Sequence, residues 1–461
     1  MATGQELSHR EKSFKKLPRF LTENAVLRYL SFSALYVAQG VPEGITFFAI
    51  PAWMAMNGKT PLEIGSFLGV IGIPWSFKII VAPLMDRFTI LSMGRKRPWV
   101  IFGQLGLIVS FLSIAFVHDP LNNLSGLMIA GFFISFFGAF QDVATDGMAI
   151  DVVPEQQQAR ANGLMWGSKT IGTSISLVTG TALINTIGFT TAVSSLSIVV
   201  ACIVLIPLLI RERPGEKLLP WTKGEPAAES KLSQLSSWKN IFMSLVKVVP
   251  LKSSVIMIAA VFFIGLMFGL VDTMLPIFTI QELGWTNTDF SHVYSVTTLI
   301  GGFLGMFAGG VLVDYFGKIR MMSLYLLFLV ISICLFAFFP GLWKSVVVIY
   351  CFVLMYYVLY TFLCIAMFAA AMNLCWKTVA ATQFTLYMAV SNMGRAAGSA
   401  LLGYIKQYAD WSNVFLFIAL MPFVALIVIQ FINFIKHLEK IKQFQEYHIE
   451  TKALLVTEDN I

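Results

Sequence analysis

Seven ionisable residues fall inside long apolar stretches of this sequence, where their neighbours along the chain are hydrophobic. A charged side chain at the centre of a bilayer costs at least about 2.5 kcal/mol, so such residues face the interior of a helix bundle and mark functional sites. The seven supply three cations and four carboxylates, a set suited to proton transfer and to binding an anionic solute. They are Glu43, Lys78, Asp142, Asp146, Lys169, Asp272 and Arg395.

Asp142 and Asp146 are four residues apart, so a helix projects both carboxylates from one face, where they titrate as a coupled pair. Lys78 and Lys169 lie at a similar predicted depth, about 12 to 14 Å from one membrane boundary. We expect a layer in which a lysine keeps the acids ionised and protonation of an acid releases the lysine. The acids are predicted to carry the proton, and the lysines to hold the solute. A permanent ion-pair network that only orients helices is the alternative.

Three more of these residues have local sequence features that suggest roles. Glu43 follows Pro42 between two glycines, where a loosened helix exposes backbone to a cavity. We predict a proton or solute role for it, with a simple helix kink as the alternative. Arg395 falls near the middle of its predicted helix, and its planar donor fork suits a carboxylate or phosphate. Asp272, shortly before Pro276, is also assigned to the solute site.

One tryptophan joins the predicted solute site. Trp166 lies between Arg160 and Lys169 on a single predicted helix. The other tryptophans and tyrosines are expected at membrane interfaces or in core packing.

The composition identifies the solvent of this chain. Its 461 residues are 57% hydrophobic and 12% charged, with a mean hydropathy of +0.77. Soluble domains carry roughly twice that charged fraction, and a bilayer span needs about 20 apolar residues. We therefore predict an all-α membrane protein with twelve transmembrane helices in two pseudo-symmetric six-helix bundles. The segments are 28–54, 62–85, 98–117, 124–151, 161–185, 188–210, 252–281, 289–315, 320–340, 344–375, 379–407 and 412–436.

Lysine and arginine accumulate in loops on one side of these segments, which predicts that both termini are cytoplasmic. The net charge of +7 thus reports membrane topology and indicates no nucleic-acid partner. The linker is predicted to contain a helix over Leu232–Val249, either lying at the membrane interface or packed under the bundle. The predicted organisation is an N-terminal tail, a first bundle, a cytoplasmic linker, a second bundle and a C-terminal tail, at 1–27, 28–210, 211–251, 252–436 and 437–461.

An aspartate, a glycine and basic residues recur in a turn of each half, at similar offsets. A carboxylate at a helix end can pair with an arginine or face a helix N-terminus, which would latch the halves on the cytoplasmic side. A solvated basic turn that only sets topology is the alternative. The turn resembles a signature of the major facilitator superfamily, in which the latch is thought to favour the outward-facing state. The predicted cytoplasmic gate comprises Asp86, Arg87, Gly94, Arg95, Asp314, Gly317 and Arg320.

Two runs in the first half resemble a narrower family. They are Phe140–Gly147, which reads Phe-Gln-Asp-Val-Ala-Thr-Asp-Gly, and Ile73–Lys78, which reads Ile-Pro-Trp-Ser-Phe-Lys. Both are similar to signatures of the peptide, acetyl-coenzyme A and drug transporter family, which includes AmpG-type muropeptide permeases. The resemblance implies a proton-driven importer of an amphiphilic, often anionic solute in a bacterial inner membrane. It adds Gln141 to the predicted solute-binding residues.

The sequence offers little for other classes of protein. The P-loop pattern GxxxxGK[ST] does not occur, and the few histidines are scattered near segment ends, so we predict neither an ATPase nor another enzyme. We expect no cofactor and no metal site. The predicted partners are a small solute, protons and lipid, with the protein acting as a monomer. Siderophore, drug or coenzyme A ester transport stays open, as does a non-transporting membrane sensor on the same scaffold.

Overall fold

A computed structural model describes residues 20–154, 158–227, 238–376 and 379–444. Within these residues each of the twelve predicted segments is helical, and the extended pairing consists of one backbone bridge between Phe20 and Arg211. The N-terminal half contains α1 (Ala25–Glu43), the π-helix η2 (Gly44–Ala49), α2 (Ile50–Met56), α3 (Pro61–Ser76), α4 (Lys78–Arg87), α5 (Arg97–Ser113), α6 (Leu124–Val152), α7 (Gln158–Ile187) and α8 (Phe189–Leu209).

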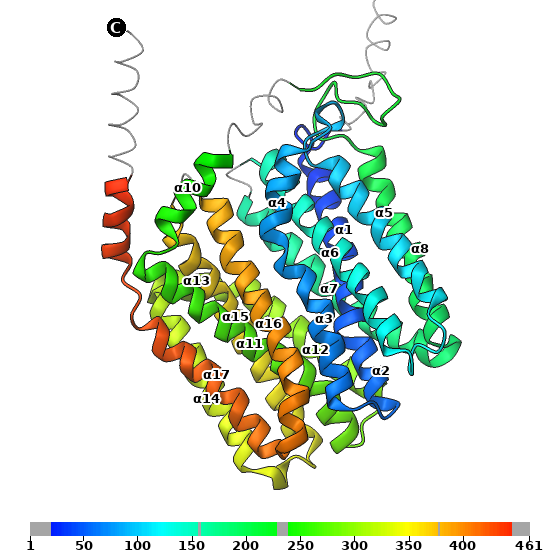
Figure 1. Cartoon of the computed structure of the whole chain (residues 1–461), viewed down its shortest axis with the longest axis vertical. Helices are drawn as coiled ribbons and strands as arrows, with labels where there is room; N and C mark the ends of the chain where they lie inside the picture. The colour runs from blue at the N-terminus through cyan, green and yellow to red at the C-terminus, as the bar shows by residue number, and fades with distance from the viewer. Residues whose placement is uncertain (1–19, 155–157, 228–237, 377–378, 445–461) are drawn as a thin grey trace, which may run out of the picture.

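The C-terminal half repeats this arrangement after the linker helix α10 (Trp238–Val248), and the two halves lie side by side in Figure 1. Its elements are α11 (Lys252–Ile277), the π-helix η6 (Phe278–Glu282), α12 (Asn287–Leu304), the π-helix η7 (Gly305–Gly309), α13 (Gly310–Phe316), α14 (Lys318–Phe338), α15 (Val346–Leu374), α16 (Ala380–Tyr408) and α17 (Trp411–Ile429).

Helices α3 and α12, which begin the second long helical segment of each half, have matching N-terminal caps. Thr60 accepts a hydrogen bond from the backbone N–H of Glu63 at the start of α3, and the Glu63 carboxylate reaches back to Thr60. Thr286 and Asp289 make the same reciprocal pair at the start of α12. Such capping boxes satisfy N–H groups that a helix leaves unpaired at its first turn. Their equivalent positions support the internal duplication predicted from the sequence.

Ten helical stretches of the described chain are long and apolar enough to cross a membrane. The helical stretches over 25–56 and 380–408 are not among them. These two carry Glu43 and Arg395, two of the seven ionisable residues of the predicted layer.

The two halves contact each other towards the end of the molecule opposite the linker. We call this the far end, and the end near α10 the linker end (Figure 1). One contact runs between α7 and α12, and the other joins η6 to the loop before α3. Along α7 and α12, Asn185 and Asn287 exchange side-chain hydrogen bonds of 3.0 and 2.9 Å, and Thr181 lies 2.8 Å from Ser291. Gln281 donates to the backbone oxygen of Lys59 at 2.8 Å. Neutral polar groups thus close the far end.

The linker helix α10 packs beneath the C-terminal half, as one of the two predicted arrangements requires. Val248 is fully buried, and Leu245 packs beside it against Trp376 and Val379. Phe242, on another face of α10, is 68% exposed. The first part of the predicted helix, up to residue 237, lies outside the described residues.

Candidate functional site

A chain of alternating charges crosses between the halves at mid-depth. Lys169 Nζ on α7 lies 3.1 Å from Oε2 of Glu43 at the end of α1, and Glu43 Oε1 lies 3.4 Å from Arg395 Nη1 on α16. Arg395 then donates from Nη2 and Nε to Oδ2 of Asp272 on α11, at 2.8 and 3.1 Å. Four of the predicted residues therefore form one continuous network, with Glu43 and Arg395 joining the halves.

Aromatic groups surround the C-terminal part of this chain. The Arg395 guanidinium lies over the rings of Phe47 and Phe268, at 4.3 and 4.6 Å from their centroids. Such faces attract a cation and restrict its position. The Tyr357 hydroxyl donates to Oδ1 of Asp272 at 3.3 Å. Arg395 is therefore held by rings from both halves and by a well-anchored carboxylate.

Close packing of α1 on α7 places Glu43 beside Lys169. A Cβ atom added to Gly40 would lie 2.4 Å from the backbone oxygen of Lys169, and one added to Gly44 would lie 2.4 Å from that of Thr173. Glycines at both positions allow the two backbones to touch. Directly after Glu43 the backbone widens into the π-helix η2, whose residues are all buried.

A second charged cluster lies within the N-terminal half. Lys78 on α4 bonds to Asp142, and the Tyr36 hydroxyl on α1 donates to Asp146. The Trp75 ring joins this cluster to the first, because Lys78 Nζ lies 4.8 Å and Lys169 Nζ 5.2 Å from its centroid. The aspartates share a helix face as predicted, and the structure supplies a different partner for each.

The remaining predicted solute residues differ in where they lie. Trp166 is 53% exposed, and its ring centroid is 5.3 Å from Lys169 Nζ and 6.2 Å from the Phe368 ring of the other half. Gln141 is fully buried and donates to the backbone oxygen of Leu35 at 3.1 Å. The structure therefore places Trp166 next to the ion pairs, and Gln141 away from them in the packing of α6 on α1.

Two of the predicted gate residues, Gly94 and Arg95, contact the start of the linker. We call this hydrogen-bonded cluster, formed by residues 94–97 and 212–216, the knot. The backbone N–H groups of Arg95, Lys96 and Arg97 donate to the Glu212 carboxylate at 3.0, 2.9 and 2.6 Å. Gly94 has φ of +103°, and a Cβ there would lie 2.7 Å from Glu212 Cδ, so glycine is required. Glu212 is fully buried.

The side chain of Arg95 pairs with Asp151 of the N-terminal half at 3.0 Å. The other described gate residues lie apart from this knot. Arg87, Asp314 and Arg320 are exposed, as is Gly317, which has φ of +90°. The side chain of Asp86 is outside the described part of the structure.

The sequence did not reveal the hydrogen-bonding partners of the charged residues, nor the polar side chains that join α7 to α12. Tyr36 lies seven residues before Glu43, two helical turns along the same face of α1, and this spacing was a usable signal. Asn185 and Asn287 could not be singled out from the sequence, because polar residues near predicted helix ends are common. Tyr357, 85 residues from Asp272, left no local signal.

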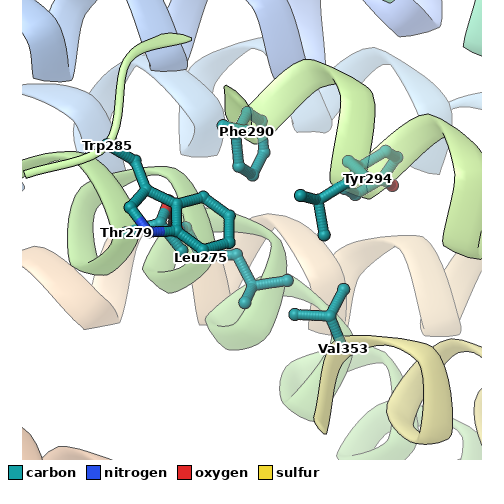
Figure 2. Close-up of a pocket in the computed structure, with 7 residues that line it drawn as sticks. Leu275, Thr279, Trp285, Phe290, Tyr294 and Val353 are labelled. Atoms are coloured by element: carbon teal, nitrogen blue, oxygen red, sulfur yellow. Dashed lines mark hydrogen bonds between the residues drawn. The ribbon is translucent and has the colours of Figure 1, made fainter. Parts of the chain in front are cut away.

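A small pocket lies elsewhere, among α11, η6, α12 and α15 of the C-terminal half. Figure 2 shows Trp285, Phe290 and Tyr294 around it, and no charged side chain is among its lining residues. An apolar lining without a cation does not suit an anionic solute. The ion-paired layer is the stronger candidate site.

Comparisons with known proteins agree with this architecture. The family model described as "Major Facilitator Superfamily" matches residues 32–399. The anhydromuropeptide permease of Escherichia coli K12 is 25% identical over 406 residues, covering 86% of this chain and 76% of the permease. The putative transporter AmpG 4 of Rickettsia conorii is 23% identical over 432 residues, covering 88% and 96%. These relatives bear out the resemblance found in the sequence.

Solved structures show the same fold. The nucleoside transporter NupG superimposes with a TM-score of 0.66 at 12% identity, covering 87% of this chain and 98% of NupG. The human organic anion transporter MFSD10 gives 0.59 at 11% identity, covering 88% and 98%. Relatives and fold neighbours are transporters, not enzymes. This integral membrane protein is a transporter that belongs to the major facilitator superfamily.

Proposed function

We propose that this chain imports a muropeptide-like anionic solute together with protons. The observation that carries the proposal is the chain Lys169–Glu43–Arg395, which bridges the halves beside the exposed Trp166. A lysine and an arginine suit solute carboxylates, and an exposed indole suits the face of a sugar ring. Relatives named as muropeptide permeases direct the choice of solute. Siderophores, drugs and coenzyme A esters are the next candidates.

The proton pathway is proposed to use the second cluster. The charged layer holds four carboxylates and three cations, so it is balanced when one carboxylate is protonated. Asp142 is paired with Lys78, whereas Asp146 accepts a hydrogen bond from the neutral hydroxyl of Tyr36. Asp146 is therefore the proposed first proton site, and Asp142 its coupled neighbour.

We further propose that the linker end is cytoplasmic and that all twelve helical rods span a bacterial inner membrane. The basic loops lie at this end, as the positive-inside rule requires. Side-chain hydrogen bonds between the halves connect residues from mid-depth to the far end, which supports an inward-facing state. Closure of the linker end is proposed to engage Arg87, Asp314 and Arg320. The protein is taken to act as a monomer.

The test is uptake of labelled anhydromuropeptide into proteoliposomes, with and without an inward proton gradient. Wild-type protein is expected to accumulate the solute only with the gradient, and Asp146→Asn to lose this accumulation. Glu225→Gln, a change at an exposed linker carboxylate, is the matched control and should behave as wild type. Uptake that ignores the gradient would contradict proton coupling. Absence of uptake would contradict this solute and turn attention to siderophores and coenzyme A esters.

A further inference from the structure

We infer that Glu43 occupies the position that a carboxylate of the solute takes during transport, between Lys169 and Arg395. On this view the empty transporter carries its own stand-in for the solute, and the arriving carboxylate displaces it. The inference rests on the proposed function, and it specifies which chemical group is recognised and which residue competes for its place.

The two acids bound to Arg395 differ in a way that identifies the exchangeable one. Asp272 receives two hydrogen bonds from Arg395 and one from Tyr357, and its side chain is 1% exposed. Glu43 makes a single contact of 3.4 Å with Arg395, and its side chain is 16% exposed. Lys169 and Arg395, the two cations that hold Glu43, are each 13% exposed. Asp272 therefore anchors Arg395, and Glu43 can leave.

The geometry of Glu43 shows what a solute carboxylate would find. Its Oε2 pairs with Lys169 and its Oε1 pairs with Arg395, so one planar carboxylate bridges cations from the two halves. A solute carboxylate in the same place would preserve the bridge between the halves. The exposed Trp166 lies beside Lys169 and offers a face to the remainder of the solute.

The backbone around Glu43 permits it to move. Pro42 precedes it and removes one helical hydrogen-bond donor, and η2 begins at Gly44 with widened turns. Wide turns of this kind occur frequently at functional sites. A displaced Glu43 can therefore swing out of the bridge without breaking a regular helix.

Displacement has a consequence for protons. A solute carboxylate adds a fifth negative group to a layer with three cations, and Glu43 loses both partners at once. An ionised carboxylate without a partner is costly away from water, so Glu43 takes up a proton when the solute binds. The solute carboxylate that displaces Glu43 would thus bring one proton into the layer, and by linkage protons would tighten solute binding.

Chemical rescue tests the site without any assumption about the solute. The probe is acetate, at tens of millimolar and constant pH, added to full-length Glu43→Ala in detergent while its thermal unfolding is followed. Acetate is expected to restore most of the lost thermal stability, whereas acetamide and sodium chloride are not. The double variant Glu43→Ala with Lys169→Met should lose the acetate effect, because one of the two cations is gone.

Binding of anhydromuropeptide supplies the second arm. Glu43→Gln is expected to bind it about tenfold more tightly than wild type and to show a weaker pH dependence of affinity, because the internal competitor is removed. Asp272→Asn leaves Glu43 in place and should not tighten binding. A muropeptide whose carboxylates are amidated should bind wild-type protein at least about tenfold more weakly.

The outcomes separate the two proposals. An acetate effect without anhydromuropeptide binding to any variant would overturn the proposed solute and support the role of Glu43. Equal muropeptide binding by wild type and Glu43→Gln, with no acetate effect, would overturn the role of Glu43 while leaving the proposed function intact. Loss of both signals would overturn both.

Discussion

Glu43 and Glu212 are two carboxylates with opposite kinds of surroundings. Glu212 is fully buried and receives hydrogen bonds from three consecutive backbone N–H groups of the N-terminal half. Glu43 is partly exposed and is held by two side-chain cations from different halves. Backbone donors are fixed by the fold, whereas long cationic side chains can change partners. The comparison separates a structural anchor at the linker end from an exchangeable bridge at mid-depth.

The largest expected effect comes from removing the exchangeable bridge on its cationic side. Arg395→Lys keeps the charge but loses the planar fork that reaches Asp272 and Glu43 together. Breaking a buried pair costs about 3 kcal/mol, so uptake of labelled muropeptide should fall about a hundredfold. Lys406→Met, on the same helix near the far end, is the control and should retain uptake. Near-normal uptake by Arg395→Lys would show that the fork is dispensable.

At Glu212, the structural anchor, we expect the reverse pattern: a substitution changes the stability of the fold more than it changes proton-coupled uptake. Glu212→Ala leaves the N–H groups of Arg95, Lys96 and Arg97 without their acceptor and should destabilise the knot by about 3 kcal/mol. Thermal unfolding and hydrogen exchange over residues 211–225 measure the loss. Folded protein that remains should still show gradient-dependent uptake. If coupling vanished while stability did not change, Glu212 would belong to the transport machinery.

A smaller effect on stability, which depends on pH, is expected from Glu216. This residue is also fully buried in the knot and lies outside the membrane spans. Burial, assisted by the nearby Glu212, raises the pKa of Glu216 to about 7, although Arg213 and Arg97 oppose the shift. Because the folded-state pKa lies above the unfolded value, the stabilising contribution is complete below about pH 4.5 and is lost as pH rises through 7.

Hydrogen exchange over residues 211–225, corrected for intrinsic rates, should therefore be a few-fold faster at pH 8 than at pH 6. Glu216→Gln should remove most of this difference, because a neutral amide does not ionise. Exposed Glu225→Gln serves as the control. A variant that keeps the full pH difference would assign the effect to another group.

The sequence predicted the helices and the layer of charges because both follow from local composition and spacing. The cost of burying Glu43, Lys169 and Arg395 in lipid made them stand out without any contact information. Their pairing could not be predicted, since Arg395 and Asp272 are 123 residues apart and meet only when helices pack. Glu212 was overlooked because its charged neighbourhood reads as a loop. Only the folded chain brings it to the N–H groups beyond Gly94.

The most direct test of the account measures accumulation and exchange in the same proteoliposomes. Asp142→Asn removes one carboxylate of the proposed proton site while keeping a side chain of similar size beside Lys78. We predict that gradient-driven accumulation of labelled anhydromuropeptide is lost, while exchange of internal for external solute continues without a gradient. Accumulation that survives in Asp142→Asn at wild-type level would contradict the assignment of proton coupling to this layer.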